Sequence, residues 1–171
     1  MALIVHKYGG SSVATVELIK SVAERVITQQ QAGNMLVVVV SAMYGVTDNL
    51  SSMAQQLGTK SCPQIYDALL ATGEQITANL LSTALINQGC PATPCYGNNL
   101  GIITDEQYNN ANILSIDPQY MHHALQKGQI VIAAGFQGTT ATGAITTLGR
   151  GGSDLTAVAL AHALQADACH I

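Results

Sequence analysis

Short β-branched runs alternate along this chain with longer stretches in which apolar residues recur at helical spacing. The clearest run is Met-Leu-Val-Val-Val-Val at 35–40, which is apolar at every position, as strands buried on both faces of a sheet are. Before it, apolar residues recur at helical spacing from Val13 to Ile27. Strands that alternate with helices of this length predict right-handed βαβ units. The expected fold is therefore α/β, with a mainly parallel sheet in a three-layer αβα arrangement.

The same two patterns place the remaining elements. Further strands are expected at 3–5, 113–116, 130–134 and from 169 to 171. Further helices are expected at 47–57, 68–85, 120–126 and 153–166. The last of these is apolar nearly all round and is expected to be buried. Residues 98–112 are polar and rich in Asn, so a loop with room for an edge strand is expected there. No repeat or linker divides the sequence, and residues 1–171 are expected to form one domain.

Charge is scarce throughout the sequence. Charged residues make up 9% and hydrophobic residues 48%, whereas soluble domains usually carry about 25% charged residues. Two explanations stay open: helices cover both faces of the sheet, or a partner covers apolar surface. The net charge of -4, with six Lys and Arg and no basic cluster, argues against nucleic-acid binding. No apolar run reaches the ~20 residues of a membrane span, so no membrane partner is expected.

The four cysteines are Cys62, Cys90, Cys95 and Cys169. Their spacing is not that of metal ligands, so we expect free thiols and no metal site on the protein. Free thiols persist in a reducing compartment, and a cytoplasmic location is therefore expected.

Polar side chains are expected at the edge of the sheet where ligands usually bind. In open parallel sheets, ligands gather at the carboxyl ends of the strands. Lys7-Tyr8-Gly9-Gly10-Ser11-Ser12 lies between an expected strand and an expected helix. Its glycines allow close approach of backbone to a ligand, Lys7 adds a positive charge, and the following helix would offer free N–H groups. A phosphate site and an ordinary strand–helix turn both fit this segment.

A second such segment is Gly-Arg-Gly-Gly-Ser-Asp at 149–154, which precedes an expected helix. Ser153 or Asp154 could act only as a helix N-cap. Arg150, however, is one of just two arginines in the chain, and its planar fork suits a carboxylate or a phosphate.

Glu74 carries the third feature, within Ala-Thr-Gly-Glu-Gln at 71–75. It is either a solvated helix residue or a group that faces a cleft and holds an amine. Together the three segments suit an anionic or zwitterionic substrate next to a phosphate.

Five motifs resemble those of aspartate kinases, and they occur in the order found in that family. They are Lys-Tyr-Gly-Gly-Ser-Ser-Val at 7–13, Val-Val-Val-Val-Ser-Ala-Met at 37–43, Ala-Thr-Gly-Glu-Gln at 71–75, Ala-Gly-Phe-Gln-Gly at 134–138 and Thr-Thr-Leu-Gly-Arg-Gly-Gly-Ser-Asp at 146–154. The resemblance implies an amino acid kinase fold. It also implies an enzyme that uses ATP with Mg²⁺ to phosphorylate the side-chain carboxylate of L-aspartate, the first step of lysine, threonine and methionine biosynthesis.

On the phosphate side, the resemblance implies two catalytic residues and a backbone cradle. Lys7, together with Gly9, Gly10 and Ser11, would hold the transferring phosphate of ATP. Asp154 would keep Lys7 in position and help to order the metal-bound phosphates.

On the aspartate side, the resemblance implies five substrate-binding residues. Arg150 would bind the α-carboxylate and Glu74 the ammonium group. The same site would be lined by Thr47, Phe136 and Ser153.

The sequence departs from the family pattern towards its end. In aspartate kinases, the strand expected at 169–171 leads into an acidic loop that holds the nucleotide, and His170 stands where Glu is common. We therefore expect the amino-terminal, aspartate- and phosphate-binding lobe of an amino acid kinase domain, truncated before the nucleotide-binding half, without ACT domains and inactive alone. It would form a homo-oligomer or associate with the missing lobe. The alternative is a non-catalytic domain that binds aspartate or assembles with a partner supplying the nucleotide lobe.

Overall fold

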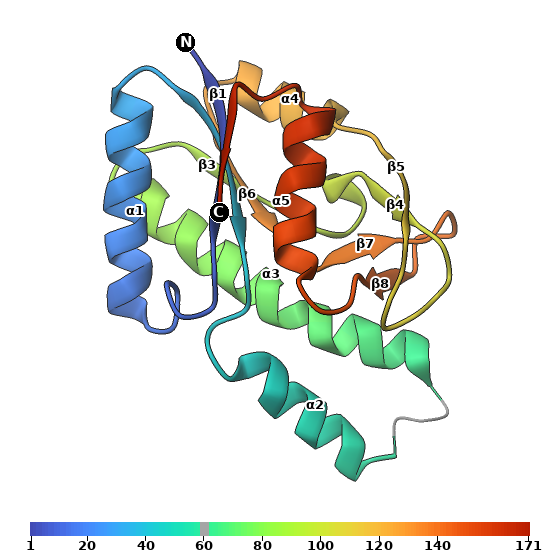
Figure 1. Cartoon of the computed structure of the whole chain (residues 1–171). Helices are drawn as coiled ribbons and strands as arrows, with labels where there is room; N and C mark the ends of the chain where they lie inside the picture. The colour runs from blue at the N-terminus through green and yellow to red at the C-terminus, as the bar shows by residue number, and fades with distance from the viewer. Residues whose placement is uncertain (59–61) are drawn as a thin grey trace.

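A computed structural model describes residues 1–58 and 62–171 of the chain (Figure 1). At its centre lies a parallel sheet of five strands in the order β3-β6-β2-β1-β9. These strands are β1 (Leu3–Tyr8), β2 (Met35–Val40), β3 (Ala92–Cys95), β6 (Ile130–Ala134) and β9 (Ala168–His170). The non-consecutive order requires crossover connections, and helices supply most of them.

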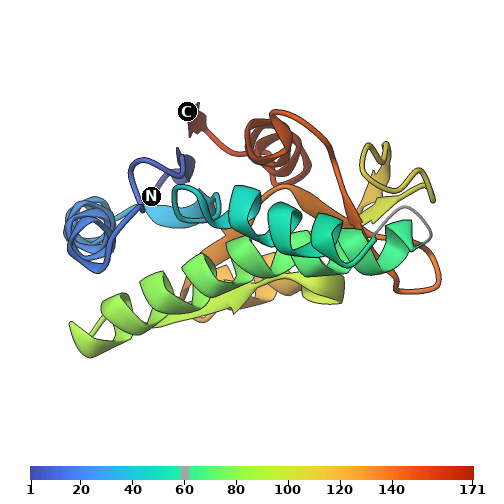
Figure 2. The same cartoon turned by 90° about the horizontal axis from the view of Figure 1, so that it is seen from below.

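Helices cover both faces of this sheet, which is one of the two explanations left open for the scarcity of charge. On one face lie α1 (Val16–Gln31) and α3 (Pro63–Asn87), and on the other lie α4 (Gln119–Gln126) and α5 (Gly152–Ala163). Consecutive residues of β2 show the two faces, because Val38 belongs to the first core cluster, Val37 to the second, and both are fully buried. Figure 2 shows α3 and α5 on opposite sides of the sheet. The expected three-layer α/β fold is confirmed.

A second, mixed sheet extends the structure beyond β6. Its strands are β5 (Ile113–Ile116), β4 (Ile102–Thr104), β7 (Gln137–Thr139) and β8 (Ile145–Thr147), in the order β5-β4-β7-β8. A short 3₁₀ helix, η2 (Gly97–Leu100), precedes β4. The sequence predicted neither β7 nor β8, since each has only three residues and is mostly polar. It also missed β3, in which Pro94 weakens the strand signal.

Several boundaries differ from the expected ones for local reasons. Helix α1 begins at Val16 rather than near Val13, because the Thr15 side chain caps it by accepting the Leu18 N–H at 3.3 Å. Helix α5 is not buried all round, since Leu155 is 46% exposed and Val158 53% exposed.

Among the described residues, no helix combines the length and the apolar composition that crossing a membrane requires.

The parallel register places three strand ends side by side. Tyr8 pairs with Val40, and Val40 pairs with Ala134. The segments that follow β1, β2 and β6 therefore leave the sheet at the same edge. Helix α2 (Val46–Gln56) follows β2 and packs against α3 beyond this edge (Figure 1).

Candidate functional site

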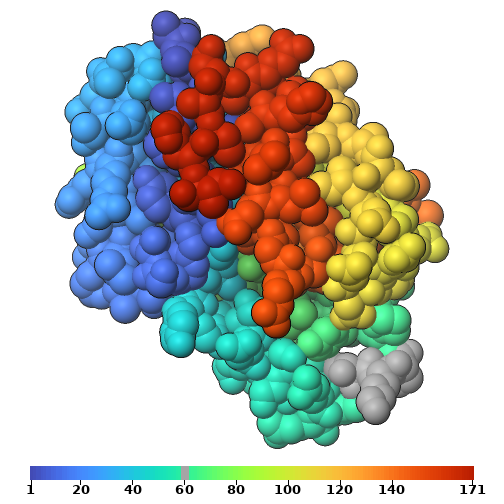
Figure 3. Space-filling view, in the orientation of Figure 1, coloured from blue at the N-terminus to red at the C-terminus, as the bar shows by residue number. Residues whose placement is uncertain are grey.

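A pocket of about 280 Å³ opens at the carboxyl edge of the parallel sheet. Its lining residues are Lys7, Ser41, Ala42, Thr47, Glu74, Phe136 and the six residues from Gly149 to Asp154. In Figure 3 this face is hollowed between the orange start of α5 and the cyan of α2, and green atoms of α3 are visible in the hollow. Every residue expected on the aspartate side lines this one pocket, although the sequence separates them by up to about a hundred positions.

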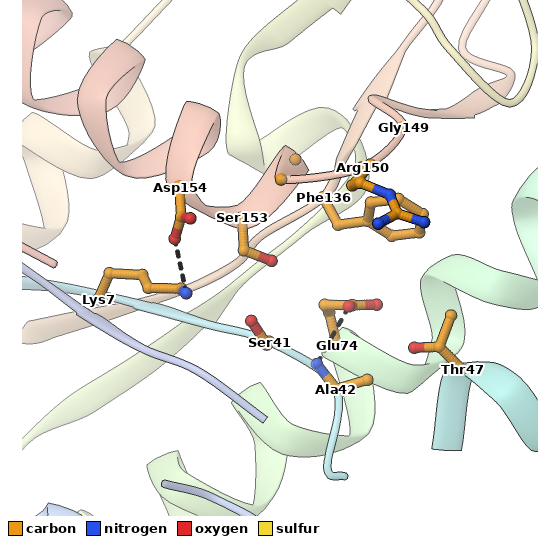
Figure 4. A pocket seen from close by; sticks show the side chains of 12 residues that line it. Lys7, Ser41, Ala42, Thr47, Glu74, Phe136, Gly149, Arg150, Ser153 and Asp154 are labelled. Atoms are coloured by element: carbon orange, nitrogen blue, oxygen red, sulfur yellow. Dashed lines mark hydrogen bonds and ion pairs between the residues drawn. The ribbon is translucent and has the colours of Figure 1, made fainter. Parts of the chain in front are cut away.

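Lys7 and Asp154 form an ion pair at one side of the pocket (Figure 4). Lys7 belongs to β1 and Asp154 to the first turn of α5, and the Nζ–Oδ1 distance is 2.6 Å. The Lys7 side chain is 16% exposed and that of Asp154 is 51% exposed. A pair this open to water adds little stability. Its clearer effect is to fix the direction of the Lys7 ammonium group.

The turn after β1 lies beside Lys7 but outside the lining of this pocket. Gly9, Gly10 and Ser11 do not line it. The turn is closed by the Ser12 N–H, which donates to the Gly9 carbonyl at 2.9 Å. A Cβ on Gly10 would lie 2.9 Å from the Ala42 carbonyl oxygen, so a glycine is required for this close approach. Phosphate binding by this turn stays a prediction.

Glu74 of α3 is buried in the pocket wall and is only 3% exposed, so its interpretation as a solvated residue is wrong. Its Oε1 accepts the Ala42 N–H at 3.0 Å. Its Oε2 is buried and has no hydrogen-bond partner among the described residues. Burial raises the pKa of Glu74 to about 7, and the Ala42 N–H partly opposes this rise. A positively charged or hydrogen-donating ligand group would satisfy the free oxygen.

Arg150 lies on a glycine-rich turn that leads directly into α5. Gly149 and Gly151 have φ values of 75° and 74°, in the left-handed region that favours glycine. Gly151 is the N-cap residue and no side chain caps the helix, so the interpretation of Ser153 or Asp154 as the N-cap is wrong. The uncapped amino terminus of α5 presents N–H groups and a positive partial charge beside Arg150. This side of the pocket suits an anion.

Close packing holds this turn against Phe136. A Cβ on Gly152 would lie 2.8 Å from Phe136 Cδ2. Phe136 itself has a φ of 69°, which is uncommon for a bulky residue. Its N–H donates to Thr156 Oγ1 at 3.1 Å, and its carbonyl accepts the Leu148 N–H at 2.9 Å. Backbone strain of this kind clusters at functional sites.

The close-up in Figure 4 shows how the polar groups face one another. The Glu74 carboxylate, the Ser41 and Ser153 hydroxyls and the Arg150 guanidinium lie around one space, and Thr47 borders it from α2. The pocket therefore offers a carboxylate opposite a guanidinium, with the Lys7 ammonium group to one side. An amino acid zwitterion next to an anion matches this arrangement of charge.

The sequence profile of the amino acid kinase family matches residues 2–171. The chain belongs to this family. It is 51% identical over 171 residues to an aspartate kinase of Pseudomonas putida and covers 42% of that protein. It is 52% identical to aspartokinase 2 of Bacillus subtilis and again covers 42% of it. The chain thus spans less than half the length of these curated relatives, and the resemblance to aspartate kinases drawn from its motifs is confirmed.

Solved structures support the same relationship. The aspartate kinase from Synechocystis superposes with a TM-score of 0.84 at 48% identity, over 98% of this chain and 27% of that one. E. coli aspartokinase III in complex with aspartate and ADP superposes with a TM-score of 0.80 over 98% of this chain and 48% of that one. Because its identity to this chain is 24%, the similarity to aspartokinase III is evidence for the fold alone.

Some residues at the site were missed by reasoning from sequence. Ser41 and Ala42 line the pocket directly after β2, so the rule that ligands bind at strand ends could have found them. Asp67 of α3 is fully buried and holds two backbone segments near the Arg150 turn. A single Asp in a helical stretch gives no signal of this kind.

Within residues 1–58 and 62–171, no group of three or more His, Cys, Asp or Glu side chains could hold a metal ion. Mg²⁺ needs fewer protein ligands than such a group would supply, because it commonly binds one or two carboxylates together with substrate phosphates and water. Asp154, half exposed beside Lys7, could contribute one such carboxylate. The residues present therefore fit a Mg²⁺ ion that arrives with a nucleotide.

Proposed function

We propose that this chain is the aspartate- and phosphate-binding lobe of an aspartate kinase. The reaction is transfer of the terminal phosphoryl group of ATP to the side-chain carboxylate of L-aspartate, which yields 4-phospho-L-aspartate. The observation that carries the proposal is the meeting of Arg150, Glu74 and Lys7 in one pocket. The charges of Arg150 and Glu74 suit the α-carboxylate and the ammonium group of an amino acid, and the charge of Lys7 suits a phosphate.

The amino acid is held at its α-carbon end. Arg150 donates to the α-carboxylate, and the uncapped amino terminus of α5 adds to the attraction. The buried Oε2 of Glu74 accepts from the α-ammonium group. Thr47, Phe136 and Ser153 complete the walls, so the side-chain carboxylate is the free end of the substrate.

The transferring phosphate lies on the Lys7 side. The Lys7 ammonium group neutralises charge on the phosphoryl group, and Asp154 holds Lys7 in place. Gly9, Gly10 and Ser11 adjoin Lys7 and provide backbone for the other phosphate oxygens. Because the substrate carboxylate is itself the nucleophile, the protein needs only to position the reactants and neutralise charge. Mg²⁺ bound to ATP would supply further neutralisation, with Asp154 as its protein ligand.

Turnover is a property of the longer relatives, of which this chain spans 42%. We expect a polypeptide of these 171 residues to bind aspartate and to lack ATP-dependent activity, since a donor that is not positioned loses most of the rate advantage. A hydroxamate assay checks this, and turnover comparable to that of a full-length relative would contradict it. A non-catalytic, aspartate-binding domain is the second candidate, and the same assay distinguishes the two.

Location and assembly follow from the same proposal. The described cysteines are all free, which fits a reducing cytoplasm. Helix α3 exposes apolar side chains at Ile76, Leu80 and Ile86, and its two charged residues, Asp67 and Glu74, are both buried. A charge-free outer face of this kind favours a homo-oligomer or contact with the remaining lobe. Light scattering over micromolar concentrations tests for the homo-oligomer.

The decisive experiment is aspartate binding measured by calorimetry on the wild type, Arg150→Ala and Arg150→Lys. Loss of a charge-assisted bidentate contact should weaken binding by roughly 2–5 kcal/mol, and lysine should recover little because it lacks the planar fork. Arg25→Ala is the matched control, since Arg25 is exposed on α1 and does not line the pocket. Succinate lacks the ammonium group and β-alanine lacks the α-carboxylate, so both should bind worse than aspartate. Equal aspartate binding by all four folded proteins would refute the proposal.

A further inference from the structure

Asp67 is a fully buried carboxylate that the proposed chemistry does not use. It lies on α3, seven residues before Glu74. No ion pair joins it to a Lys or Arg within the described part of the chain. Instead it accepts two backbone N–H groups: that of Asn109, at 3.0 and 2.9 Å from its two oxygens, and that of Thr147, at 2.7 Å from Oδ2. A buried carboxylate that accepts hydrogen bonds from two backbone segments marks a place where backbone position matters.

The two segments that Asp67 holds form one unit. The Ala111 N–H donates to the Thr147 carbonyl at 2.9 Å. A Cβ on Gly149 would lie 2.5 Å from Asn110 Oδ1, so the 109–111 loop also packs against the start of the glycine-rich turn. Thr147 is the last residue of β8 and stands three positions before Arg150. Asp67 therefore fixes both the strand that leads into the Arg150 turn and the loop that supports this turn.

Helix α3 thus carries one carboxylate that lines the pocket, Glu74, and one that holds the backbone leading to Arg150, Asp67. Residues seven apart lie about two turns apart on the same side of a helix, a separation of about 10 Å along its axis. Glu74 reaches the pocket directly, whereas Asp67 reaches only the backbone that carries Arg150. An α-amino acid has its ammonium and carboxylate groups on one carbon, so a site for it needs these two protein groups at a fixed separation.

We infer that Asp67 is a positioning residue for substrate recognition, which sets the Arg150 turn at a fixed distance from Glu74. The inference rests on the proposed function for its consequence in aspartate binding, but its structural part can be tested without a ligand. A carboxylate is required because three N–H···O contacts converge on its two oxygens. In an asparagine, one of these oxygens becomes an NH₂ group that faces an N–H donor.

A purely structural role for Asp67 makes a different prediction. In that case Asp67→Asn lowers stability, but the folded molecules still bind aspartate with the wild-type Kd. Thr104→Val provides a matched control for this possibility. It removes a buried hydroxyl pair, Thr104 Oγ1 to Thr146 Oγ1 at 2.6 Å, and so weakens the attachment of β8 next to Thr147 without touching the Asp67 contacts.

The experiment compares the wild type, Asp67→Asn and Thr104→Val, all shown to be folded by circular dichroism. We expect Asp67→Asn to raise the Kd for aspartate about tenfold, as the loss of a buried hydrogen-bond acceptor does. We expect Thr104→Val to keep the wild-type Kd within about twofold, since the hydroxyl pair that it removes contacts neither Asp67 nor the Arg150 turn. Equal Kd values for Asp67→Asn and the wild type would overturn the inference.

Amide hydrogen exchange by NMR provides the second readout, and it decides the case in which the wild type binds no aspartate. Exchange at 148–152 should be faster in Asp67→Asn than in the wild type, with the amides of β1 and β2 unchanged, and Thr104→Val should leave 148–152 unchanged. Faster exchange there without aspartate binding would reject the proposed function and keep the positioning role of Asp67. Unchanged exchange at 148–152 in Asp67→Asn would reject the positioning role itself.

Discussion

Two glycine-containing turns meet at the carboxyl edge of the sheet, and they differ in how each one connects to its helix. After Gly9 and Gly10 the chain continues through further turn residues before α1, whose amino terminus is capped by Thr15. The turn at 149–152 leads directly into α5, which no side chain caps. Only the second turn lines the pocket along its whole length.

This difference separates two features that a sequence motif combines. Glycines allow a close approach of backbone, as Gly10 does against the Ala42 carbonyl. An anion site at a helix also requires that the first N–H groups of the helix are free and directed at the ligand. The 149–152 turn lines the pocket and leads into a helix that no side chain caps, whereas on the other side the pocket is lined by Lys7 at the end of β1 and not by the turn that follows it. The distance from the glycines to the helix start, and the capping residue, are therefore better indicators than the glycines alone.

The largest expected effect concerns Glu74, which faces the α5 turn across the pocket. Burial raises its pKa from 4.5 to about 7. Below pH 4.5 the carboxyl group is protonated in both the folded and the unfolded chain. As the pH rises to 7, the unfolded chain loses this proton first, so the free energy of unfolding falls by roughly 3 kcal/mol. Glu74→Gln does not ionise and should be more stable than the wild type by about this amount at pH 8, while it binds aspartate more weakly.

Urea unfolding at pH 4.5 and pH 8 measures this difference. Glu24→Gln is a suitable control, because Glu24 is exposed on α1. If the difference in the free energy of unfolding between Glu74→Gln and the wild type does not change with pH, burial does not raise the pKa of Glu74. The comparison would then rest on the α5 turn alone.

The next effect compares the two turns directly, through Gly152→Ala and Gly9→Ala. A Cβ on Gly152 would lie 2.8 Å from Phe136 Cδ2 and 3.2 Å from Phe136 Cα. We expect a loss of roughly 1–3 kcal/mol in the free energy of unfolding, together with weaker aspartate binding, because Phe136 and the Arg150 turn must move apart. A Cβ on Gly9 would meet only Lys7 Nζ, at 3.5 Å, which is an ordinary contact with a flexible side chain.

Denaturant unfolding of the two variants checks this prediction. Gly9→Ala should stay within about 0.5 kcal/mol of the wild type, as most unstrained surface changes do. Equal losses in the two variants would mean that Gly9 is packed as closely as Gly152, and the contrast between these two positions would disappear.

Much of the fold was predictable because its main signals are local. The run of β2 is apolar at every position because this strand is buried on both faces of the sheet. The apolar residues of α1 recur at helical spacing because this helix is buried on one face only. In the mixed sheet, β5 was predicted as a strand, whereas β7 and β8 were not. The rest of this sheet was not predictable in the same way. The Thr104–Thr146 hydroxyl pair and the buried Gln137 stabilise it through polar contacts between distant segments, which leave no periodic pattern.

The candidate site divides in the same way. Lys7 and Arg150 lie within two positions of glycines at element ends, and this local context made them visible. Asp67 has no such context. Its importance comes from contacts 42 and 80 positions away, with Asn109 and Thr147, and these contacts exist only after folding.

The smallest effect concerns the ion pair between Lys7, at the end of β1, and Asp154, in the first turn of α5. Asp154 is 51% exposed, so a double-mutant cycle of Lys7→Met and Asp154→Asn should give a coupling of only about 0.2–1 kcal/mol in unfolding. The coupling should shrink further in 1 M salt, where charges are screened within roughly 3 Å. Binding of inorganic phosphate should respond more strongly, and more to Lys7→Met than to Asp154→Asn, since Lys7 provides the charge and Asp154 only orients it. A coupling of several kcal/mol that persists in salt would show that the two segments form one rigid unit. The pocket could then no longer be divided into the end of β1, which supplies the charge of Lys7, and the start of α5, which supplies a helix terminus. Neither segment would keep its geometry without the other.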